Sequence, residues 1–389
     1  MKNSMKKNIL FVNDERMIGG VSILLEDILR VIDYSKYNVD ILILHNNGDR
    51  MKNLPEGVNI FYGTKFFDTI DIPIREILSI KYIGKLISKA RLVFYLKTGL
   101  INNKIKKERK KILNKQYDAE IAFKDGFTAI FTANGDSIKK IHWLHSDYLR
   151  DDPNAKYKKL LTKAYDKFDV IVGISEGVKK HFNDIYRNSE KTIVINDLID
   201  EQKVKDMAGE KEPYTGEKLR VTCVGRLHPY KGFEQLLYAM KKLKDEGLLD
   251  NININVLGEG FERKSLINLR AELGLDNYIE FLGNKENPYT YLNNSDLFIL
   301  SSKAEAFGIV VVEAQMLGVP VLATDCVSIR ELVTDNVTGL VVENSAEGLY
   351  NGFKKLIIDK ELLSEFSENL KTYQYNNNKI IKELNDLFA

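Results

Sequence analysis

Short apolar runs alternate with longer amphipathic stretches along the whole chain. The short runs are rich in Val and Ile and read as buried strands, whereas the longer stretches carry apolar residues at helical spacing. Strands that alternate with helices in this way are typical of parallel sheets wrapped by helices. Two such series follow one another, so the pattern predicts two α/β domains, each with a doubly wound parallel sheet.

The first series of predicted strands comprises residues 9–12, 39–44, 138–144, 170–174 and 192–195. The second comprises residues 219–224, 252–257, 278–282, 296–300 and 319–323, with helical patterns between them such as 232–248 and 261–273. Residues 200–218 are polar, contain two glycines and a proline, and show no burial pattern, which favours a domain junction. We therefore expect one domain over 1–199, a second over 200–370, and a helical segment over 371–389 that either completes the second domain or crosses back to the first.

Composition narrows the class of protein. The 389 residues are too many for one ordinary core, and the fractions of 44% hydrophobic and 29% charged residues are those of a globular protein. A net charge of +2 gives no reason to expect nucleic-acid binding. Cys223 and Cys326 lie in apolar runs without metal spacing, and no run has the ~20 apolar residues of a membrane span. These features favour a cytoplasmic protein.

Positive charge is concentrated in residues 81–115, which hold twelve Lys and Arg residues against the single acid Glu108. Apolar residues are interleaved with them, so the segment predicts a pair of basic amphipathic helices. Two interpretations stay open. The basic side chains form a solvated face, or they dock on an anionic membrane surface, where each contributes ~1 kcal/mol.

The segment 301–314 follows the predicted strand 296–300, at the carboxyl end where open α/β sheets bind ligands. Gly308 allows backbone to approach a ligand, and the amides of Ala306, Phe307 and Gly308 point outward where a helix starts. Glu305 and Glu313 can then face one cleft and accept hydrogen bonds from a hydroxyl-rich ligand. The alternative is that both acids only cap or solvate the helix.

A second constellation, Gly225-Arg226 with Lys231-Gly232, also lies between a predicted strand and a helix. Arg226 and Lys231 present two cations where the helix start already favours an anion. A diphosphate fits, because its negative charge grows as a leaving group departs. Surface charge without function is the alternative for such a pair.

The N-terminal half offers weaker signals. Gly19 and Gly20 follow the first strand and open a helix, as in a turn or a loop that approaches a ligand. Neither a Gly-x-Gly-x-x-Gly fingerprint nor a P-loop occurs, which argues against nicotinamide and P-loop chemistry. His145 ends a strand, where it can donate to a substrate hydroxyl. No residue cluster has the spacing of a zinc or other metal site.

These residues together resemble glycosyltransferase family 4, a group of retaining enzymes with the GT-B fold, in which two Rossmann-like domains face a central cleft. Glu305 and Glu313 match its Glu-x7-Glu motif. Further matches in the right order are Gly19-Gly20, His145, Gly173-Ile174-Ser175-Glu176, Gly225-Arg226 with Lys231-Gly232, Gly258-Glu259-Gly260, Phe281-Leu282-Gly283 and Thr338-Gly339-Leu340. Residues 194–199 depart from the family by lacking its common Pro-Asn-Gly turn.

The resemblance implies a role for each matched residue. Arg226 and Lys231 would bind the donor diphosphate, Glu313 the ribose, and Glu305 hydroxyls of the transferred sugar. The backbone of Ala306, Phe307 and Gly308 would complete this site, the base would pack near Gly283 and Asn284, Gly19 and Gly20 would approach the diphosphate, and His145 would lie near the sugar.

The expected protein is therefore a metal-independent retaining glycosyltransferase without a cofactor. By family frequency its donor is a UDP-sugar carrying a hexose or N-acetylhexosamine, and its acceptor is a glycan or a lipid-linked saccharide. Two alternatives remain at this point: a non-catalytic GT-B partner of another transferase, and a nucleotide-sugar epimerase or phosphorylase on the same architecture. Intact Glu305, Glu313, Arg226 and Lys231 argue against the first.

Overall fold

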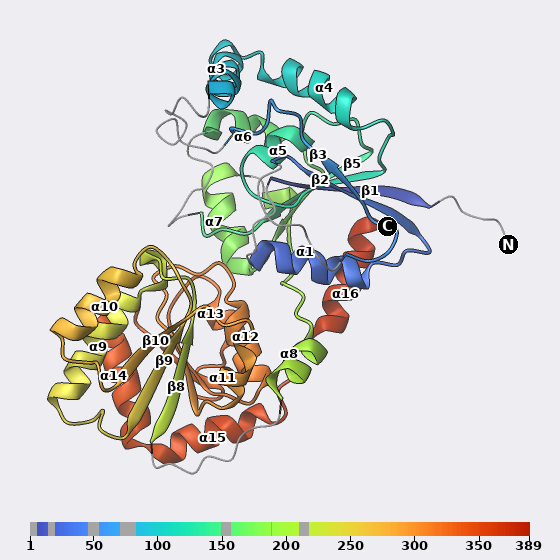
Figure 1. Ribbon diagram of the computed structural model, residues 1–389. Coiled ribbons are helices and arrows are strands. Elements are labelled where there is room, and N and C mark those ends of the chain that lie inside the picture. The colour runs from blue at the N-terminus through green and yellow to red at the C-terminus, as the bar shows by residue number, and fades with distance from the viewer. Residues whose placement is uncertain are drawn as a thin grey trace. The chain divides into compact units, whose positions relative to one another are not determined.

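The structure is a computed structural model that describes residues 6–14, 20–45, 54–70, 83–148, 157–187, 189–209 and 218–389. The chain divides into two compact units (Figure 1). The first is formed by Met1–Leu198 together with Asn378–Ala389, and the second by Ile199–Asn377.

The first unit contains a seven-stranded parallel sheet with the order β3-β2-β1-β4-β5-β6-β7. Its strands are β1 (Lys7–Asn13), β2 (Tyr37–Ile43), β3 (Asn59–Tyr62), β4 (Ala119–Ala122), β5 (Lys139–Leu144), β6 (Val170–Gly173) and β7 (Thr192–Val194). Its described helices are α1 (Gly20–Val31), α3 (Ile83–Thr98), α4 (Ile101–Ile112), α5 (Phe127–Thr132), α6 (Lys158–Tyr165), α7 (Glu176–Tyr186) and α16 (Asn377–Phe388). The basic segment therefore forms the helix pair that its pattern predicts.

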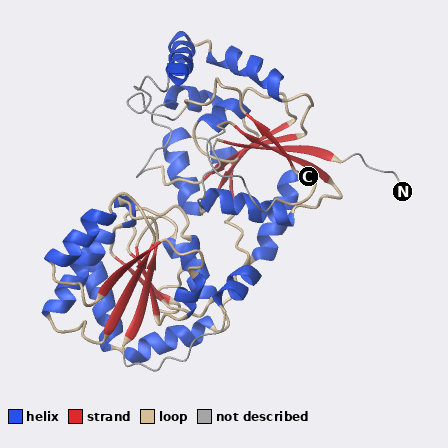
Figure 2. Cartoon of the chain, viewed as in Figure 1, coloured by secondary structure: helices blue, strands red, loops and turns tan. Residues whose placement is uncertain are grey.

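The second unit contains a six-stranded parallel sheet with the order β10-β9-β8-β11-β12-β13. Its strands are β8 (Leu219–Val224), β9 (Ile252–Leu257), β10 (Ile279–Gly283), β11 (Leu297–Leu300), β12 (Val321–Thr324) and β13 (Gly339–Val342). Its described helices are α8 (Glu201–Ala208), α9 (Phe233–Asp245), α10 (Arg263–Glu272), α11 (Tyr289–Asn293), α12 (Ile309–Met316), α13 (Ile329–Leu332), α14 (Ala346–Ile358) and α15 (Lys360–Leu370). Both faces of this sheet are covered by helices (Figure 2).

Strand β11 shows why its sequence reads as one continuous apolar run. Leu297 and Ile299 belong to the core cluster that contains Phe353 of α14, whereas Phe298 and Leu300 belong to the cluster that contains Val311 of α12. Successive side chains of a strand point to opposite faces, and helices cover both faces here. Each residue of the strand is therefore buried, and no polar alternation appears.

The last helix, α16, belongs to the first unit. The ring of Phe388 packs against Phe11 of β1 and Tyr37 of β2, with centroids 6.0 and 6.2 Å apart. The Nζ atom of Lys139 donates to the carbonyl of Leu387 at 2.6 Å. The chain therefore returns to the first sheet after completing the second.

Residues 200–209, the described first part of the polar stretch, contain a helix that the sequence did not predict. Helix α8 begins after Asp200, whose carboxylate accepts a hydrogen bond from the amide of Lys203 at 3.0 Å. Val204 and Ala208, two of the helix's few apolar residues, are its buried residues. Helix α8 has only eight residues, or about two turns, and each turn contributes one buried side chain. Two buried residues are too few to give a helical pattern of hydrophobicity in the sequence.

Candidate active site

In each sheet the strand order changes direction beside the first strand. Strand β8 lies between β9 and β11, and β1 lies between β2 and β4. Loops that leave a parallel sheet on opposite sides of such a point create a crevice at the carboxyl ends of the strands, where ligands bind. The loops after β8 and β11 carry the charged residues singled out by the sequence.

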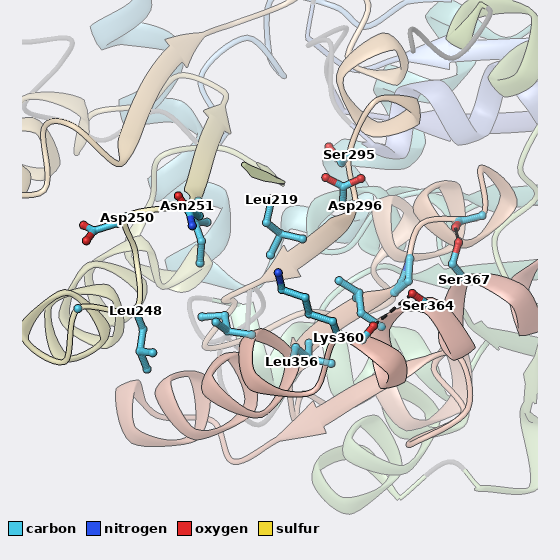
Figure 3. A pocket seen from close by; sticks show the side chains of 16 residues that line it. Leu219, Leu248, Asp250, Asn251, Ser295, Asp296, Leu356, Lys360, Ser364 and Ser367 are labelled. Atoms are coloured by element: carbon cyan, nitrogen blue, oxygen red, sulfur yellow. Dashed lines mark hydrogen bonds between the residues drawn. The ribbon is translucent and has the colours of Figure 1, made fainter. Parts of the chain in front are cut away.

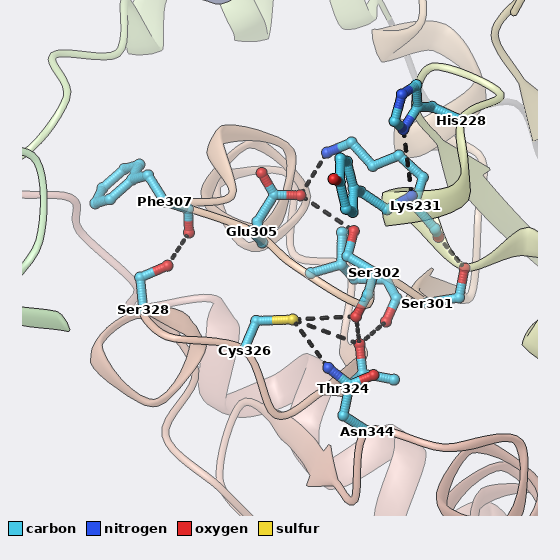
Figure 4. A network of polar contacts seen from close by, with 12 residues as sticks. His228, Lys231, Ser301, Ser302, Glu305, Phe307, Thr324, Cys326, Ser328 and Asn344 are labelled. Carbon is cyan, nitrogen blue, oxygen red and sulfur yellow. Dashed lines mark hydrogen bonds and ion pairs between the residues drawn. The ribbon is translucent and has the colours of Figure 1, made fainter. Parts of the chain in front are cut away.

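The structure brings Lys231 and Glu305 into direct contact (Figure 4). The Nζ atom of Lys231 lies 2.5 Å from Oε2 of Glu305, and the hydroxyl of Ser302 donates to the same oxygen at 3.1 Å. The side chains are 28% and 16% exposed, so a ligand from solvent can still reach both. An acid and a cation separated by 74 positions in the sequence thus meet at the switch point.

Backbone hydrogen bonds join the same two loops. The carbonyl of Tyr230 accepts from the amides of Lys303 and Ala304 at 2.7 and 3.2 Å. Gly232 follows a 3₁₀ turn over Pro229–Lys231 and has φ 64°, and a Cβ atom there would lie 1.9 Å from the carbonyl oxygen of Ser301. Only glycine fits this position, because both the conformation and the close approach exclude a side chain.

The loop after β9 packs on the loop after β8 in a similar way. Gly258 has φ 137°, and a Cβ atom there would lie 2.0 Å from the carbonyl oxygen of Gly225. The amide of Leu227 donates to the carbonyl of Glu259 at 2.9 Å. The loops after three adjacent strands, β9, β8 and β11, are therefore held together at this edge of the sheet.

Helix α12 supplies the second acid. Gly308, with φ 98°, precedes its first residue, and the carbonyl of Phe307 accepts a hydrogen bond from the Ser328 hydroxyl at 2.7 Å. Glu313 lies on the second turn, where Oε1 accepts from the Tyr289 hydroxyl at 2.9 Å. The amide groups at the start of α12 favour an anion or an oxygen-rich ligand near Glu305.

The remaining predicted donor-site residues of this unit also lie at strand ends. Arg226 is exposed after β8 and makes no ion pair with the residues that the structure describes. Gly283 ends β10 with φ 72°, and Asn284 after it is exposed. Arg226 is therefore available to an anionic ligand, while Lys231 is already engaged by Glu305.

The predicted residues of the first half lie in the first unit. Gly20 is the first residue of α1, and Gly19 lies outside the described residues. His145 follows β5, and its ring packs against Phe123 with centroids 5.1 Å apart. Burial lowers the pKa of His145 to about 3, as it does for His142, so both rings are neutral near pH 7.

A buried carboxylate fixes the loop that carries His145. Asp125 accepts hydrogen bonds from the Tyr148 hydroxyl, from the Ser146 hydroxyl at 2.9 Å and from the amide of His145 at 3.2 Å. Burial raises the pKa of Asp125 to about 6, although these hydrogen bonds oppose the rise. Nothing in the sequence motifs marks this residue, because it is a single acid after a short strand.

The sequence motifs also failed to identify other residues of the site. Tyr289, Ser302, Ser328 and Asn344 each hold a residue or a backbone group of the two loops, and none belongs to a recognisable spacing. Asn344 donates to the carbonyl of Lys303 at 3.0 Å from the loop after β13. Such contacts depend on the folded arrangement of four strand ends and leave no local signal.

A cavity of about 550 Å³ lies elsewhere in the second unit (Figure 3). Its walls include Leu219 and Ile252, which begin β8 and β9, together with Asp296 before β11. It is therefore at the amino ends of the strands, opposite to the loops described above. Among the described residues no group of three or more His, Cys, Asp and Glu side chains is arranged to hold a metal. Cys223 and Cys326 are buried and form no disulfide.

Comparisons with known proteins agree with this geometry. Residues 205–373, which make up most of the second unit, match the family described as glycosyl transferases group 1. An uncharacterized glycosyltransferase of Haemophilus influenzae is 27% identical over 289 residues, which cover 72% of this chain and 78% of that protein. These similarities support a glycosyltransferase.

Two further proteins are similar to this chain: a relative whose activity is named, and a protein of known structure. The N-acetylgalactosamine-N,N'-diacetylbacillosaminyl-diphospho-undecaprenol 4-alpha-N-acetylgalactosaminyltransferase of Campylobacter jejuni is 28% identical over 232 residues, or 58% of this chain and 61% of that protein. The structure also resembles the crystal structure of Anabaena HepE in complex with UDP. The alignment covers 98% of this chain and 99% of the HepE chain, with 18% sequence identity and a TM-score of 0.69. HepE has also been solved with UDP-glucose. The predicted GT-B class, with two doubly wound parallel-sheet domains, is confirmed.

Proposed function

We propose that the chain is a retaining glycosyltransferase of family 4 that moves a hexose or N-acetylhexosamine from a UDP-sugar to a glycan or lipid-linked saccharide. The observation that carries the proposal is the Lys231–Glu305 contact at the β8–β11 switch point, within the segment that matches group 1 glycosyltransferases. A cation and an acid at that point suit a ligand with both phosphate and sugar hydroxyl groups. UDP as the nucleotide is supported by its presence in HepE.

Each residue of the site has a chemical task in this proposal. Arg226 and Lys231 stabilise the negative charge that develops on the leaving diphosphate. Glu305 orients Lys231 before the donor binds and then accepts hydrogen bonds from sugar hydroxyls, while Glu313 accepts them from the ribose. Amides of Ala306, Phe307 and Gly308 contact the donor at the start of α12.

From the first unit and the end of β10 come the remaining contacts. The base packs near Gly283 and Asn284, Gly20 with Gly19 approaches the diphosphate, and neutral His145 donates to the sugar. His145 suits this task because its low pKa keeps the ring uncharged near pH 7.

The proposed reaction retains the configuration of the sugar. The bond between the anomeric carbon and the phosphate oxygen breaks, the acceptor oxygen bonds to the same face of that carbon, and the departing phosphate oxygen takes the acceptor proton. Because the phosphate oxygen takes this proton, the reaction needs no carboxylate base. We also propose that no metal ion or cofactor takes part. Lys231 and Arg226 would supply the charge compensation that a divalent ion gives in other enzymes.

The test is a panel of nucleotide sugars titrated into the purified protein, with donor hydrolysis measured in the absence of acceptor. We expect a UDP-sugar to bind and to be hydrolysed slowly with release of UDP and a sugar that first has the anomeric configuration of the donor. Binding without turnover of any donor would favour a non-catalytic partner of another transferase. Conversion into a second nucleotide sugar would favour an epimerase.

We also propose that the acceptor is handled at an anionic membrane surface on the cytoplasmic side. Support comes from α3 and α4, where Ile87 and Phe94 are 53% and 57% exposed among basic residues, and from the lipid-linked substrate in the name of the Campylobacter relative. Within the described residues no helix combines the length and the hydropathy needed to cross a bilayer. Sedimentation with phosphatidylglycerol vesicles tests the proposal, and equal recovery in the supernatant with and without vesicles would contradict it.

A further inference from the structure

The first unit contains a charged cavity, which no motif marks. It has a volume of about 320 Å³ and lies between the segment after β3 and the helices α3 and α4. Its lining residues are Thr64, Lys65, Phe66, Ser88, Arg91, Lys104, Glu108 and Lys111. We refer to this cavity as the anion pocket.

Positive charge exceeds negative charge in the anion pocket. Four cationic side chains, those of Lys65, Arg91, Lys104 and Lys111, surround the single carboxylate of Glu108, so the formal charge is +3. Lys65 and Arg91 make no ion pair with any residue that the structure describes. Cations gathered in one cavity repel one another, and an anion from solution relieves that repulsion.

Glu108 accounts for two of the cations. Its Oε1 atom accepts from Lys104 at 2.5 Å and from Lys111 at 2.8 Å, and Oε2 accepts from the Thr64 hydroxyl at 2.8 Å. The residue is only 3% exposed. Burial opposes its ionisation, but these hydrogen bonds lower the pKa of Glu108 to about 2, so it stays charged near pH 7.

Neighbouring residues keep Lys104 in place. Lys104, Glu108 and Lys111 are spaced so that they lie on one face of α4. The Nζ atom of Lys104 also lies 5.2 Å from the ring centroid of Phe66 and 5.7 Å from that of Tyr95. Lys104 is thus fixed between the buried Glu108 and two aromatic rings. This arrangement is not that of a solvated helix face.

The position of the pocket in the sheet is informative. Thr64 and Lys65 follow β3, so they lie at the carboxyl edge of the first sheet, the edge that also carries Asp125 and His145. In an all-parallel sheet this is the edge at which ligands bind. The pocket is therefore placed in the unit and at the edge expected for an acceptor.

Resting on the proposed function, we propose that the anion pocket binds a diphosphate group carried by the acceptor substrate. A diphosphate that links two organic groups has two negative charges, which Lys65 and Arg91 can neutralise without displacing Glu108. The planar guanidinium of Arg91 can donate two parallel hydrogen bonds to phosphate oxygens, and the Ser88 hydroxyl adds a further donor. The volume exceeds that of one small anion and suits two linked phosphates.

The experiment is calorimetric titration of the full chain with N-acetylglucosaminyl geranyl diphosphate, whose diphosphate links two organic groups, while saturating UDP occupies the donor site. We expect one equivalent to bind, and the double variant K65Q/R91Q to bind at least about tenfold more weakly because two charge-assisted contacts are lost. The charge-matched control is K163Q/K167Q, which removes two exposed lysines of the same unit and should change the affinity less than about twofold. UDP affinity and melting temperature verify that each variant is folded.

Several results would overturn the proposal. One is the absence of N-acetylglucosaminyl geranyl diphosphate binding in the presence of UDP, and another is equal affinity in K65Q/R91Q and wild type. A third is that K65Q/R91Q loses only its binding to phosphatidylglycerol vesicles, since the pocket would then contact lipid headgroups. Donor hydrolysis separates this proposal from the proposed function: a chain that binds N-acetylglucosaminyl geranyl diphosphate through the pocket but hydrolyses no UDP-sugar would contradict the function alone.

Discussion

The carboxyl edges of the two sheets are built differently at their switch points. In the second unit, backbone atoms join the loops: the Tyr230 carbonyl accepts from two amides, and Gly232 lies against the Ser301 carbonyl. In the first unit, backbone bonds also occur at this edge, such as that from the amide of His45 to the carbonyl of Asp14 at 2.7 Å, and side chains add the contacts that follow. Asp14 pairs with Lys124 at 2.8 Å, and Asp125 receives three hydrogen bonds from the loop after β5.

This difference determines how visible each edge is in the sequence. Contact between backbones requires glycine where a Cβ atom would collide, so the second unit is marked by glycines at fixed distances from charged residues. A network of side chains requires only acids and hydroxyls near strand ends, which are common in any sequence. The half that resembles a donor site is therefore easier to recognise than the half that would receive the acceptor.

The largest effect is expected at the charged centre of the second unit. Lys231→Ala removes a cation from the leaving diphosphate and should lower kcat for UDP-sugar hydrolysis about 10²- to 10³-fold, as for other lost transition-state contacts. Lys241→Ala is the control, because Lys241 pairs with Asp245 on the exposed side of α9. Wild-type turnover in Lys231→Ala would remove this residue from the mechanism.

Gly232 tests whether the backbone contact between the loops is essential. Gly232→Ala forces a side chain against the Ser301 carbonyl at positive φ and should lower the free energy of unfolding by about 4 kcal/mol. Gly247→Ala is the matched control, since Gly247 also has positive φ but a Cβ atom there would have no neighbour within 4 Å, and should cost about 1 kcal/mol. Chemical denaturation measures both, and equal losses would show that only the conformation matters.

Asp125 tests the side-chain network of the first unit through pH. Because burial raises its pKa from 3.8 to about 6, the folded chain retains a proton that the unfolded chain has lost in this range. The associated stability is present below pH 4 and is lost as the pH rises through 6, by roughly 3 kcal/mol. Between pH 4 and pH 7 the unfolding free energy of wild type should therefore fall relative to that of Asp125→Asn. A constant difference would show that Asp125 ionises normally.

The smallest effects compare one helix start in each unit. The hydroxyl of Ser175 accepts from the amide of Val178 at 3.1 Å, and that of Ser345 accepts from the amide of Gly348 at 3.0 Å. Replacement of either serine by alanine should cost about 1 kcal/mol. If the units unfold separately, calorimetry should show each variant lowering only its own transition.

Most strands were predicted from their apolar runs, but β3, β4 and the four-residue strand β13 were not. Strand β4 was missed because Glu120 interrupts its apolar pattern, although this residue is fully buried and pairs with Arg109 at 2.6 Å. Strand β3 was missed because it is at the edge of the sheet and partly exposed. A buried ion pair and an edge position both add polar residues to a strand, which hides it from a pattern of hydrophobicity.

The candidate site divides in the same way. Glycines and charges directly after strands pointed to Arg226, Lys231, Glu305 and Glu313, because strand ends meet at one edge of a parallel sheet. The hydrogen bonds of Tyr289 and Ser328 could not be predicted, since they depend on which loops lie side by side. The sequence showed only the charge excess of residues 81–115, because the pocket arises where the segment after β3, which carries Lys65, meets α3 and α4.

The central claim is that the loops after β8 and β11 bind the diphosphate of a nucleotide sugar. Calorimetric titration of UDP into wild type and Arg226→Ala tests it most directly, because Arg226 is exposed and its removal leaves the Lys231–Glu305 contact intact. We predict saturable binding of one UDP by wild type and an affinity at least about tenfold lower in the variant. No binding of UDP, or equal affinity in both proteins, would contradict the account.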